Sequence, residues 1–181
     1  MWLTGGQYEA WASFLERWGA GEALDPASLP ALSTEDLAGD SWQRLVERIT
    51  AALSQRLRSW SETLSREISG AGDEFSAARA LNHARWSLPP IRALAGAAAL
   101  PAEVSTRLLA LVDDQIRDSQ RQLDEQTDRM RRAGLPYSAV EARLRTIRDN
   151  PLTVLAAGPH VTDAGWAADP AARPRRRVIV D

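Results

Sequence analysis

One stretch constrains the fold more than any other: after its first residue, the segment at residues 101–133 contains neither proline nor glycine. Pro101 suits the first position of a helix, because its missing N–H would have no partner there. Gly134 and Pro136 are typical of a helix end. At 1.5 Å per residue, this helix would be about 50 Å long. A chain of 181 residues organised around such a rod is predicted to be elongated.

A second long helix is predicted at about residues 41–69, with Asp40 as its N-cap. Its apolar residues recur at steps of three and four, which is the period of a single buried helix face. They are Trp42, Val46, Ile49, Leu53, Leu57, Trp60, Leu64 and Ile68. We expect this face to pack along the helix at residues 101–133.

Shorter helices are predicted before and between these two. Thr4 and Gln7 form a capping box that opens a helix ending near Gly19, with Tyr8, Trp11, Leu15 and Trp18 on one face. A loop with a short helical turn at residues 33–37 follows. Asp73 caps a helix at residues 74–87, whose apolar members are Phe75, Ala78, Leu81 and Trp86.

Two consecutive prolines, Pro89 and Pro90, are predicted to end that helix, because proline lacks an N–H and clashes with the preceding turn. A separate short helix is expected at residues 91–100, and a last one between Ser138 and Asn150. The fold class is therefore all-α: an elongated bundle on two long helices (about 41–69 and 101–133), with shorter helices packed on them. We expect one domain at residues 1–150 and an extended tail at residues 151–181, where four prolines interrupt regular structure.

Composition narrows the possible chemistry. The chain contains no cysteine, and all 22 basic residues are arginine, which excludes disulfides, cysteine nucleophiles and lysine-based catalysis. Arginine without lysine, together with abundant alanine, predicts a GC-rich bacterial source. No apolar run approaches the ~20 residues needed to span a bilayer, and no signal peptide is recognisable, so we expect a cytoplasmic protein outside the membrane.

Charge is unevenly distributed along the chain. Residues 1–40 carry one arginine and seven acidic residues, a net charge of −6, whereas residues 41–150 carry 17 arginines and 14 acidic residues, a net charge of +3. Such asymmetry favours oriented contacts, either within the chain or between copies.

The helix at residues 101–133 carries a candidate docking seam. Its second half repeats apolar residues every seven positions, as half of a coiled-coil seam does: Leu109, Ile116, Leu123 and Met130. The complementary positions are mostly polar: Val112, Ser119, Gln126 and Ala133. Acid–base pairs four residues apart are predicted on its flanks: Asp113–Arg117, Glu125–Arg129 and Asp128–Arg132. Two interpretations stay open, an exposed helix that overhangs the bundle and a docking surface at residues 109–133 for a second copy or another protein.

The tail offers a second candidate contact. Its members are a lone tryptophan, an arginine cluster and a β-prone end: Trp166, Arg175, Arg176, Arg177, Val178, Ile179 and Val180. Such a segment can add a strand to a partner's sheet, with its arginines on acidic residues of the partner. The alternative is that it folds back on the acidic N-terminal third of its own chain.

Signals for catalysis are weak. The string from Asp113 to Asp118, DDQIRD, resembles the aspartate-rich motif of isoprenoid synthases, an all-helical family in which such carboxylates hold Mg²⁺ and diphosphate. Adjacent aspartates point about 100° apart on a helix, and arginines lie beside Asp114 and Asp118, so the residues favour a solvated charged face. Asn82, His83 and Trp86 are candidates for lining a small pocket.

No nucleophile motif or phosphate-binding loop occurs, and we expect no catalytic residue, metal or cofactor. The residues favour a non-catalytic helical adaptor, scaffold or assembly subunit that binds protein partners, possible homo-oligomerisation included. The first alternative is an accessory nucleic-acid-binding protein that uses arginine-rich helix faces. The second alternative is a small helical enzyme or ligand-binding bundle.

Overall fold

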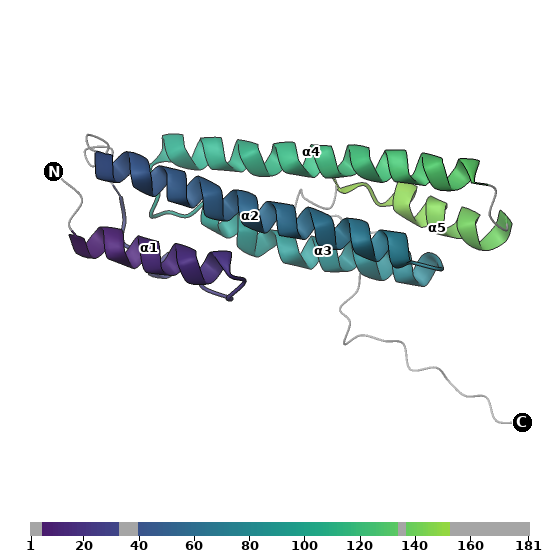
Figure 1. Cartoon of the computed structure of the whole chain (residues 1–181), viewed down its shortest axis with the longest axis horizontal. Coiled ribbons are helices and arrows are strands. Elements are labelled where there is room, and N and C mark those ends of the chain that lie inside the picture. Colours follow the sequence, from purple (N-terminus) through teal and green to yellow (C-terminus); the bar gives the residue numbers. More distant parts are fainter. Residues whose placement is uncertain (1–4, 33–39, 134–136, 153–181) are drawn as a thin grey trace, which may run out of the picture.

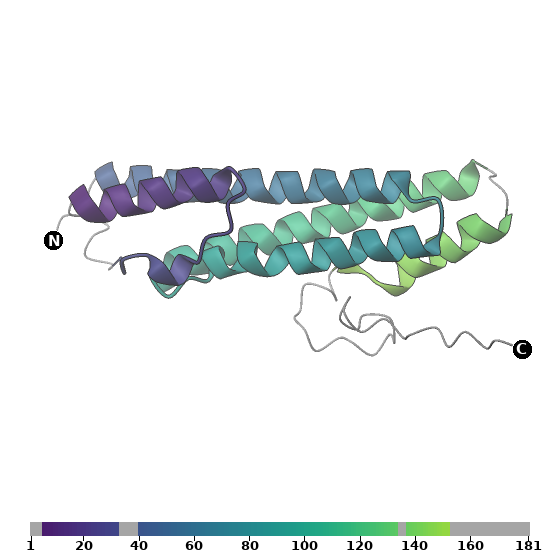
Figure 2. The ribbon, with the colours of Figure 1, turned by 90° about the horizontal axis from the view of Figure 1, so that it is seen from below.

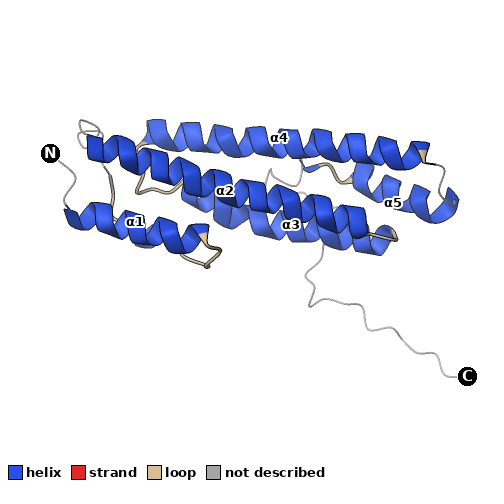
Figure 3. Cartoon of the chain, in the orientation of Figure 1, coloured by secondary structure: helices blue, strands red, loops and turns tan. Residues whose placement is uncertain are grey.

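The structure is a computed structural model that describes residues 5–32, 40–133 and 137–152. It confirms the all-α class: the described residues form helices and no strand (Figures 1 and 3). The helices are α1 (Gly5–Gly19), α2 (Asp40–Gly70), α3 (Glu74–Ala95), α4 (Ala102–Arg132) and α5 (Tyr137–Asp149), with a 3₁₀ turn at Pro26–Ser28. Within these ranges, no helix combines the length and the hydrophobicity that crossing a bilayer requires.

Three long helices, α2, α3 and α4, lie side by side along the long axis of the molecule (Figures 1 and 2). The shorter helices cover opposite ends of this group. Helix α1 packs on the first half of α2, and α5 packs on α3 and α4 near the far end. The segment that follows α1 then crosses from the α2 side to the α3 side (Figure 2).

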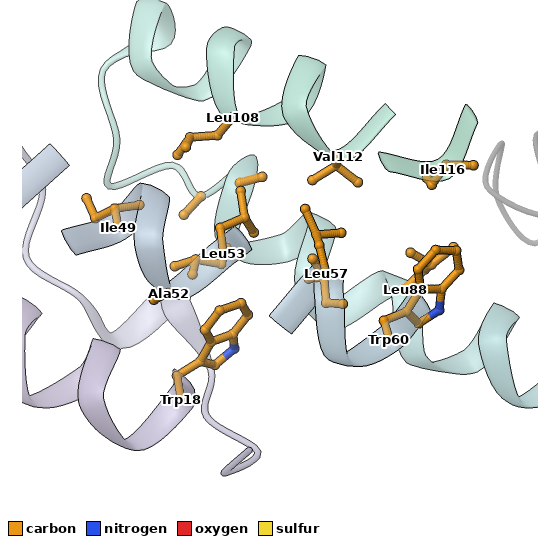
Figure 4. Close-up of a cluster of buried hydrophobic side chains, with 14 of the residues drawn as sticks. Trp18, Ile49, Ala52, Leu53, Leu57, Trp60, Leu88, Leu108, Val112 and Ile116 are labelled. Carbon is orange, nitrogen blue, oxygen red and sulfur yellow. The ribbon is translucent and has the colours of Figure 1, made fainter. Parts of the chain in front are cut away.

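The core runs along the facing surfaces of these helices (Figure 4). In α2 the predicted apolar face is buried at every position except Val46, which is half-buried, and Leu45 beside it is fully buried. In α1 the predicted apolar face has Trp11, Leu15 and Trp18 buried, whereas Tyr8 is half-buried against the same core. The Trp11 indole N–H donates to the Pro30 carbonyl at 3.0 Å, which ties α1 to the segment after it.

Helix α3 differs from its prediction. Pro89 and Pro90 do not end it; the helix continues from Glu74 to Ala95, so the separate helix at residues 91–100 is wrong. Both prolines are exposed, whereas Leu88, Ile91 and Leu94 around them are buried. A proline inside a helix costs ~3 kcal/mol, and burying a leucine or isoleucine gains ~1.5–3 kcal/mol each, so continuing the buried face offsets the interruption.

The N-terminal end of α3 is held by specific polar contacts. Asp73 is its N-cap: the carboxylate accepts hydrogen bonds from the Ser76 hydroxyl at 2.6 Å and from the Ser76 N–H at 2.7 Å. These bonds favour the charged carboxylate and lower the pKa of Asp73 below its ordinary value, the hydroxyl bond having the larger effect. From α5, the buried guanidinium of Arg143 donates to the carbonyl of Ala71 in the turn before α3.

The described core extends slightly past the predicted start of the tail. Leu152 is fully buried, and its N–H donates to the Gln120 side chain of α4 at 2.7 Å. Pro151 and Leu152 therefore complete the contact that α5 makes with the long helices. The predicted turn at residues 33–37 lies outside the described residues.

Candidate functional site

A trough lies between α2 and α3. It lies on the part of these helices beyond the end of α1, which Figure 1 shows packed along the first part of α2. Its volume is about 210 Å³, and its lining comes entirely from these two helices. The lining residues are Arg56, Ser59, Trp60, Thr63, Leu64 and Glu67 from α2, and His83, Ala84, Ser87 and Ile91 from α3. The helical period explains this set, because Arg56, Ser59, Thr63 and Glu67 follow steps of three and four along one side of α2.

The floor of the trough is apolar and its rim is polar. Trp60, Leu64 and Ile91 are buried side chains of the core that form the floor. The Trp60 indole N–H donates to the Ala84 carbonyl at 3.0 Å, so its single donor is already used within the bundle. A ligand in the trough would therefore meet the carbon surface of this ring and not its polar atom.

One end of the trough is closed by an interhelical pair. His83 Nδ1 lies 2.7 Å from Glu67 Oε1, which joins α3 to α2. The Ser87 hydroxyl donates to the main-chain carbonyl of His83 at 2.7 Å and is therefore not directed at the imidazole. This arrangement is that of a structural pair and lacks the serine-to-histidine contact of a nucleophilic site.

The other end of the trough holds Arg56, next to the end of α1. Its guanidinium carbon lies 4.8 Å from the centroid of the Trp18 ring, a cation–π contact. The side chain is half-buried, and this burial lowers the pKa of the guanidinium from its ordinary value. Among the described residues, no carboxylate forms an ion pair with Arg56.

A second surface feature lies on the outward side of α3. Phe75 and Trp86 are the large apolar side chains that the described residues leave exposed, with 73% and 59% of their surface accessible. They are eleven residues apart, which places them on one face of the helix, about 16 Å from each other. The guanidinium of Arg85 lies 5.8 Å from the Trp86 ring, while Arg79 is exposed between the two aromatic side chains. Of the four apolar residues predicted on this helix, Leu81 is buried and Ala78 is half-buried, whereas Phe75 and Trp86 are exposed.

A third feature is a wide polar groove of about 730 Å³ between α2 and α4. Serines of α2 face glutamines of α4 along it, Ser61, Ser65 and Ser69 opposite Gln115 and Gln122. Beneath the groove, the Ser61 and Ser119 hydroxyls are 2.9 Å apart. The Gln126 side chain also donates to the Ser69 hydroxyl at 2.6 Å, so two polar contacts join the helices along this groove.

The residues of the predicted seam on α4 face the interior of the bundle. Ile116 and Leu123 are buried in the bundle, with only 2% and 3% of their surface exposed, and Met130 and Leu109 are half-buried against the same core. The residues expected to meet a partner at residues 109–133 therefore meet α2, α3 and α5 of their own chain. Only one side of α4 faces the bundle, so a narrow apolar stripe is enough to pack the helix against its own chain.

The aspartates that resemble an isoprenoid synthase motif are each paired with an arginine. Asp113 pairs with Arg92 of α3, and not with Arg117 as predicted. Asp114 pairs with Arg117, and Asp118 pairs with Arg121. In residues 5–32, 40–133 and 137–152, no group of three histidine, cysteine, aspartate or glutamate side chains converges in a way that suits a metal ion.

The other predicted salt bridges on α4 are partly shifted. The Glu125–Arg129 pair is present, at 4.0 Å. Asp128 pairs with Arg131, three residues on, and not with Arg132. These pairs lie on an exposed surface, where each contributes little to stability.

The remaining site predictions have mixed outcomes. Of the three residues expected to line a pocket, His83 lines the trough, while Trp86 faces outward and Asn82 is not part of the lining. The tail residues predicted to bind a partner, Trp166, Arg175, Arg176, Arg177, Val178, Ile179 and Val180, lie outside the described residues.

Comparisons with known proteins find no match: no family model, no curated protein and no solved structure resembles this chain. The trough and the α3 face are therefore interpreted from their own residues.

Sequence reasoning missed the trough because its two walls come from residues far apart in the chain. The polar residues Arg56, Ser59, Thr63 and Glu67 recur at steps of three and four along α2. This spacing was a usable signal, because it places all four on one side of the helix. Which residues of α3 lie opposite them depends on where the turn between α2 and α3 ends.

Proposed function

We propose that this chain is a non-catalytic helical interaction subunit that binds a protein partner through the outward face of α3. The observation that carries the proposal is the joint exposure of Phe75 and Trp86 on that face. Each ring would gain free energy from burial, at ~25 cal/mol per Å² of apolar surface, yet the bundle leaves both in water. Tryptophan and arginine are also the residue types that most often dominate binding energy at protein interfaces.

The charges on this face favour a partner with acidic side chains beside apolar ones. Arg79 lies exposed between the two rings, and Arg85 stacks against Trp86. Cation–π stacking holds the indole in place and reduces the conformational entropy that binding would otherwise remove. A carboxylate of the partner would pair with the exposed Arg79, while its apolar side chains covered the two rings. Arg85 is buried and supports the Trp86 ring from within the bundle.

The arginines elsewhere support a protein partner over a nucleic acid. Many of them are engaged within the chain: Arg117 and Arg121 with aspartates of α4, and Arg48 with the Tyr8 ring. Arginines that are already paired contribute less to a phosphate-binding surface, and the sequence pI of about 5.8 is acidic. A nucleic acid therefore remains the less supported ligand.

Site-specific photo-cross-linking in the producing cells tests this proposal. A benzoylphenylalanine residue replaces Trp86 or Phe75, and a matched control carries it at the exposed Glu125 of α4. We expect one protein to be joined to both α3 positions and not to the control. After that protein is purified, Trp86→Ala should weaken its binding to the chain at least tenfold, whereas Glu125→Ala should leave the affinity unchanged.

Four results would contradict the proposal: cross-links only to nucleic acid, cross-links only to a second copy of the chain, the same products from the Glu125 control, and no product at either α3 position. Both aromatic side chains are exposed, so their replacement should not disturb folding, and circular dichroism spectra check this point.

A further inference from the structure

The described chain ends at the same level of the bundle as the middle of α3. Leu152 is fully buried, and its N–H donates to the Gln120 side chain of α4. Helix α4 runs antiparallel to α3 (Figure 1), and the ion pair Arg92–Asp113 joins the two helices. Arg85 and Gln120 are each seven residues from this pair, and equal rises along antiparallel helices place them at one level. The chain therefore reaches Leu152 at the level of Arg85.

The outward face of α3 at this level lacks a complete set of contacts. The guanidinium carbon of Arg85 lies 5.8 Å from the centroid of the exposed Trp86 ring, and the exposed Phe75 lies about 16 Å along the helix from it. Arg79 adds an exposed positive charge between the two rings. A ligand of this face therefore needs an aromatic or apolar group and at least one carboxylate.

The residues after Leu152 contain a segment of this composition. Residues 163–169 read Asp-Ala-Gly-Trp-Ala-Ala-Asp, so Trp166 has an acidic residue three positions away on each side. Trp166 is the only tryptophan, tyrosine or phenylalanine after Leu152, and no arginine occurs before Arg173. Tryptophan supplies a large apolar surface, and a carboxylate forms a strong, charge-assisted pair with a guanidinium. The segment is therefore complementary to the α3 face in both charge and apolar surface.

The length of the intervening chain allows the contact. Trp166 follows Leu152 by fourteen residues. A flexible chain of this length has a root-mean-square end-to-end distance of ~19–22 Å, and its fully extended length is ~46–50 Å. Both exposed rings of the face lie within this reach. A ligand tethered in this way has an effective concentration on the order of 1 mM, so even a weak contact is populated.

We propose that residues 163–169 bind the outward face of α3 of the same chain, with Trp166 against the exposed rings and one flanking aspartate paired with Arg79. The inference rests on the function proposed for this face, because the segment would occupy the surface that the protein partner needs. The partner then binds only those chains in which the segment has left the face. Its apparent affinity is reduced by the fraction of chains in that state.

Indole N–H signals in ¹H–¹⁵N NMR spectra of the full-length chain test the contact without any partner. Each of the seven tryptophans gives one such signal, and Trp86→Phe and Trp166→Phe assign the two of interest. We expect Trp166→Ala to shift the Trp86 signal, because a ring that packs nearby changes its magnetic environment. Arg79→Gln should move the Trp166 signal towards its position in concentrated urea, because the ion pair is lost.

Three controls accompany these spectra. Arg58→Gln removes an exposed arginine of α2 on the α4 side and should leave the Trp166 signal unchanged. The signals of the buried Trp11 and Trp18 should stay in place in every variant, which verifies that the bundle is intact. A ¹⁵N-labelled Trp166→Ala chain mixed with an unlabelled Trp86→Phe chain should keep its shifted Trp86 signal, because the segment acts within its own chain.

The proposal is overturned if the Trp86 signal is the same in the wild-type and Trp166→Ala chains, or if Arg79→Gln and Arg58→Gln affect the Trp166 signal equally. Recovery of the wild-type Trp86 signal in the mixture would show exchange between copies and would also overturn it. A Trp166 signal that responds to replacement of the exposed α1 residues Glu9 and Glu16 by glutamine, and not to Arg79→Gln, would place the segment on α1 instead.

The spectra and the partner cross-linking fail separately. If the Trp86 and Trp166 signals are coupled but no partner is joined to the α3 face, the function proposed for the face is wrong and the contact within the chain stands. If a partner is found and the signals are independent, the reverse holds. When both are found, Trp166→Ala should tighten partner binding at least threefold, and an unchanged affinity would overturn the competition.

Discussion

Helices α2 and α4 have the same length, 31 residues, but they are held in the bundle by different forces. Helix α2 buries nine residues, all of them apolar, between α1, α3 and α4. Helix α4 buries six, one of which is Ser119. Its second half also relies on hydrogen bonds: Ser119 with Ser61, and Gln126 with Ser69 at 2.6 Å. Two helices of equal length thus depend on apolar burial to different degrees, because their neighbours differ.

This comparison explains why the predicted docking seam is internal. A mostly polar column beside Ile116 and Leu123 indicated a weak seam open to a partner. In the bundle, that column meets serines of α2, so its polar groups are satisfied within the chain. Polar residues at an interface therefore do not show that the interface lies between molecules.

The largest expected effect comes from removing a core side chain of α2. Leu53→Ala should lower the free energy of unfolding by ~3–5 kcal/mol, because Leu53 is fully buried among three helices and its loss leaves a cavity (Figure 4). Leu123→Ala in α4 should cost less, ~2–3 kcal/mol, since polar neighbours and the adjoining groove let the site relax. Urea denaturation of both variants gives the comparison, and a larger loss for Leu123→Ala would reverse the ranking of the two helices.

A smaller effect is expected where the chain leaves α5. Leu152→Ala should lower the free energy of unfolding by ~2–3 kcal/mol, because the side chain is fully buried. A chain that ends at Asn150 should lose at least as much relative to a chain that ends at Leu152, since it also removes the N–H bond to Gln120. Equal stability of the two shortened chains, measured by thermal and chemical unfolding, would show that α4 does not need this contact.

The smallest expected effect concerns the polar contact between α2 and α4. Ser61→Ala and Ser119→Ala should each cost ~0.5–1.5 kcal/mol, because each leaves the other hydroxyl without its partner in a partly buried place. The double variant should cost less than the sum of the two, with a coupling free energy of ~0.5–1 kcal/mol in a double-mutant cycle. Strict additivity would mean that the two hydroxyls do not stabilise the interface together.

Much of the local structure was predictable. The helix at residues 101–133 was recognisable because Pro101 and Gly134 bound it and no helix-breaking residue interrupts it. The buried face of α2 followed from apolar steps of three and four, with Val46 as the one position that is only half-buried. The burial of individual aromatic side chains was less predictable. Trp18 is buried against α2, whereas no described helix covers Trp86.

The prolines of α3 show where local rules fail. A break at Pro89 is correct for an isolated helix, because the lost hydrogen bond and the clash outweigh helix propensity. In the bundle, Leu88, Ile91 and Leu94 lie on one buried face, and the free energy gained by burying them offsets the cost of the prolines. The trough could not be predicted for a related reason. Its Glu67–His83 contact joins two different helices, and nothing in the sequence around either residue indicates that they lie together.

The sequence by itself determined the all-α class and the face of α2 that is buried, because hydrophobic period and helix caps act over one to four residues. Only the tertiary structure decided that the stripe on α4 is internal, that α3 passes through its prolines, and that Phe75 and Trp86 stay in water. Those outcomes depend on which helix lies opposite each face. That choice is made by the packing of distant segments and is not encoded in any single helix.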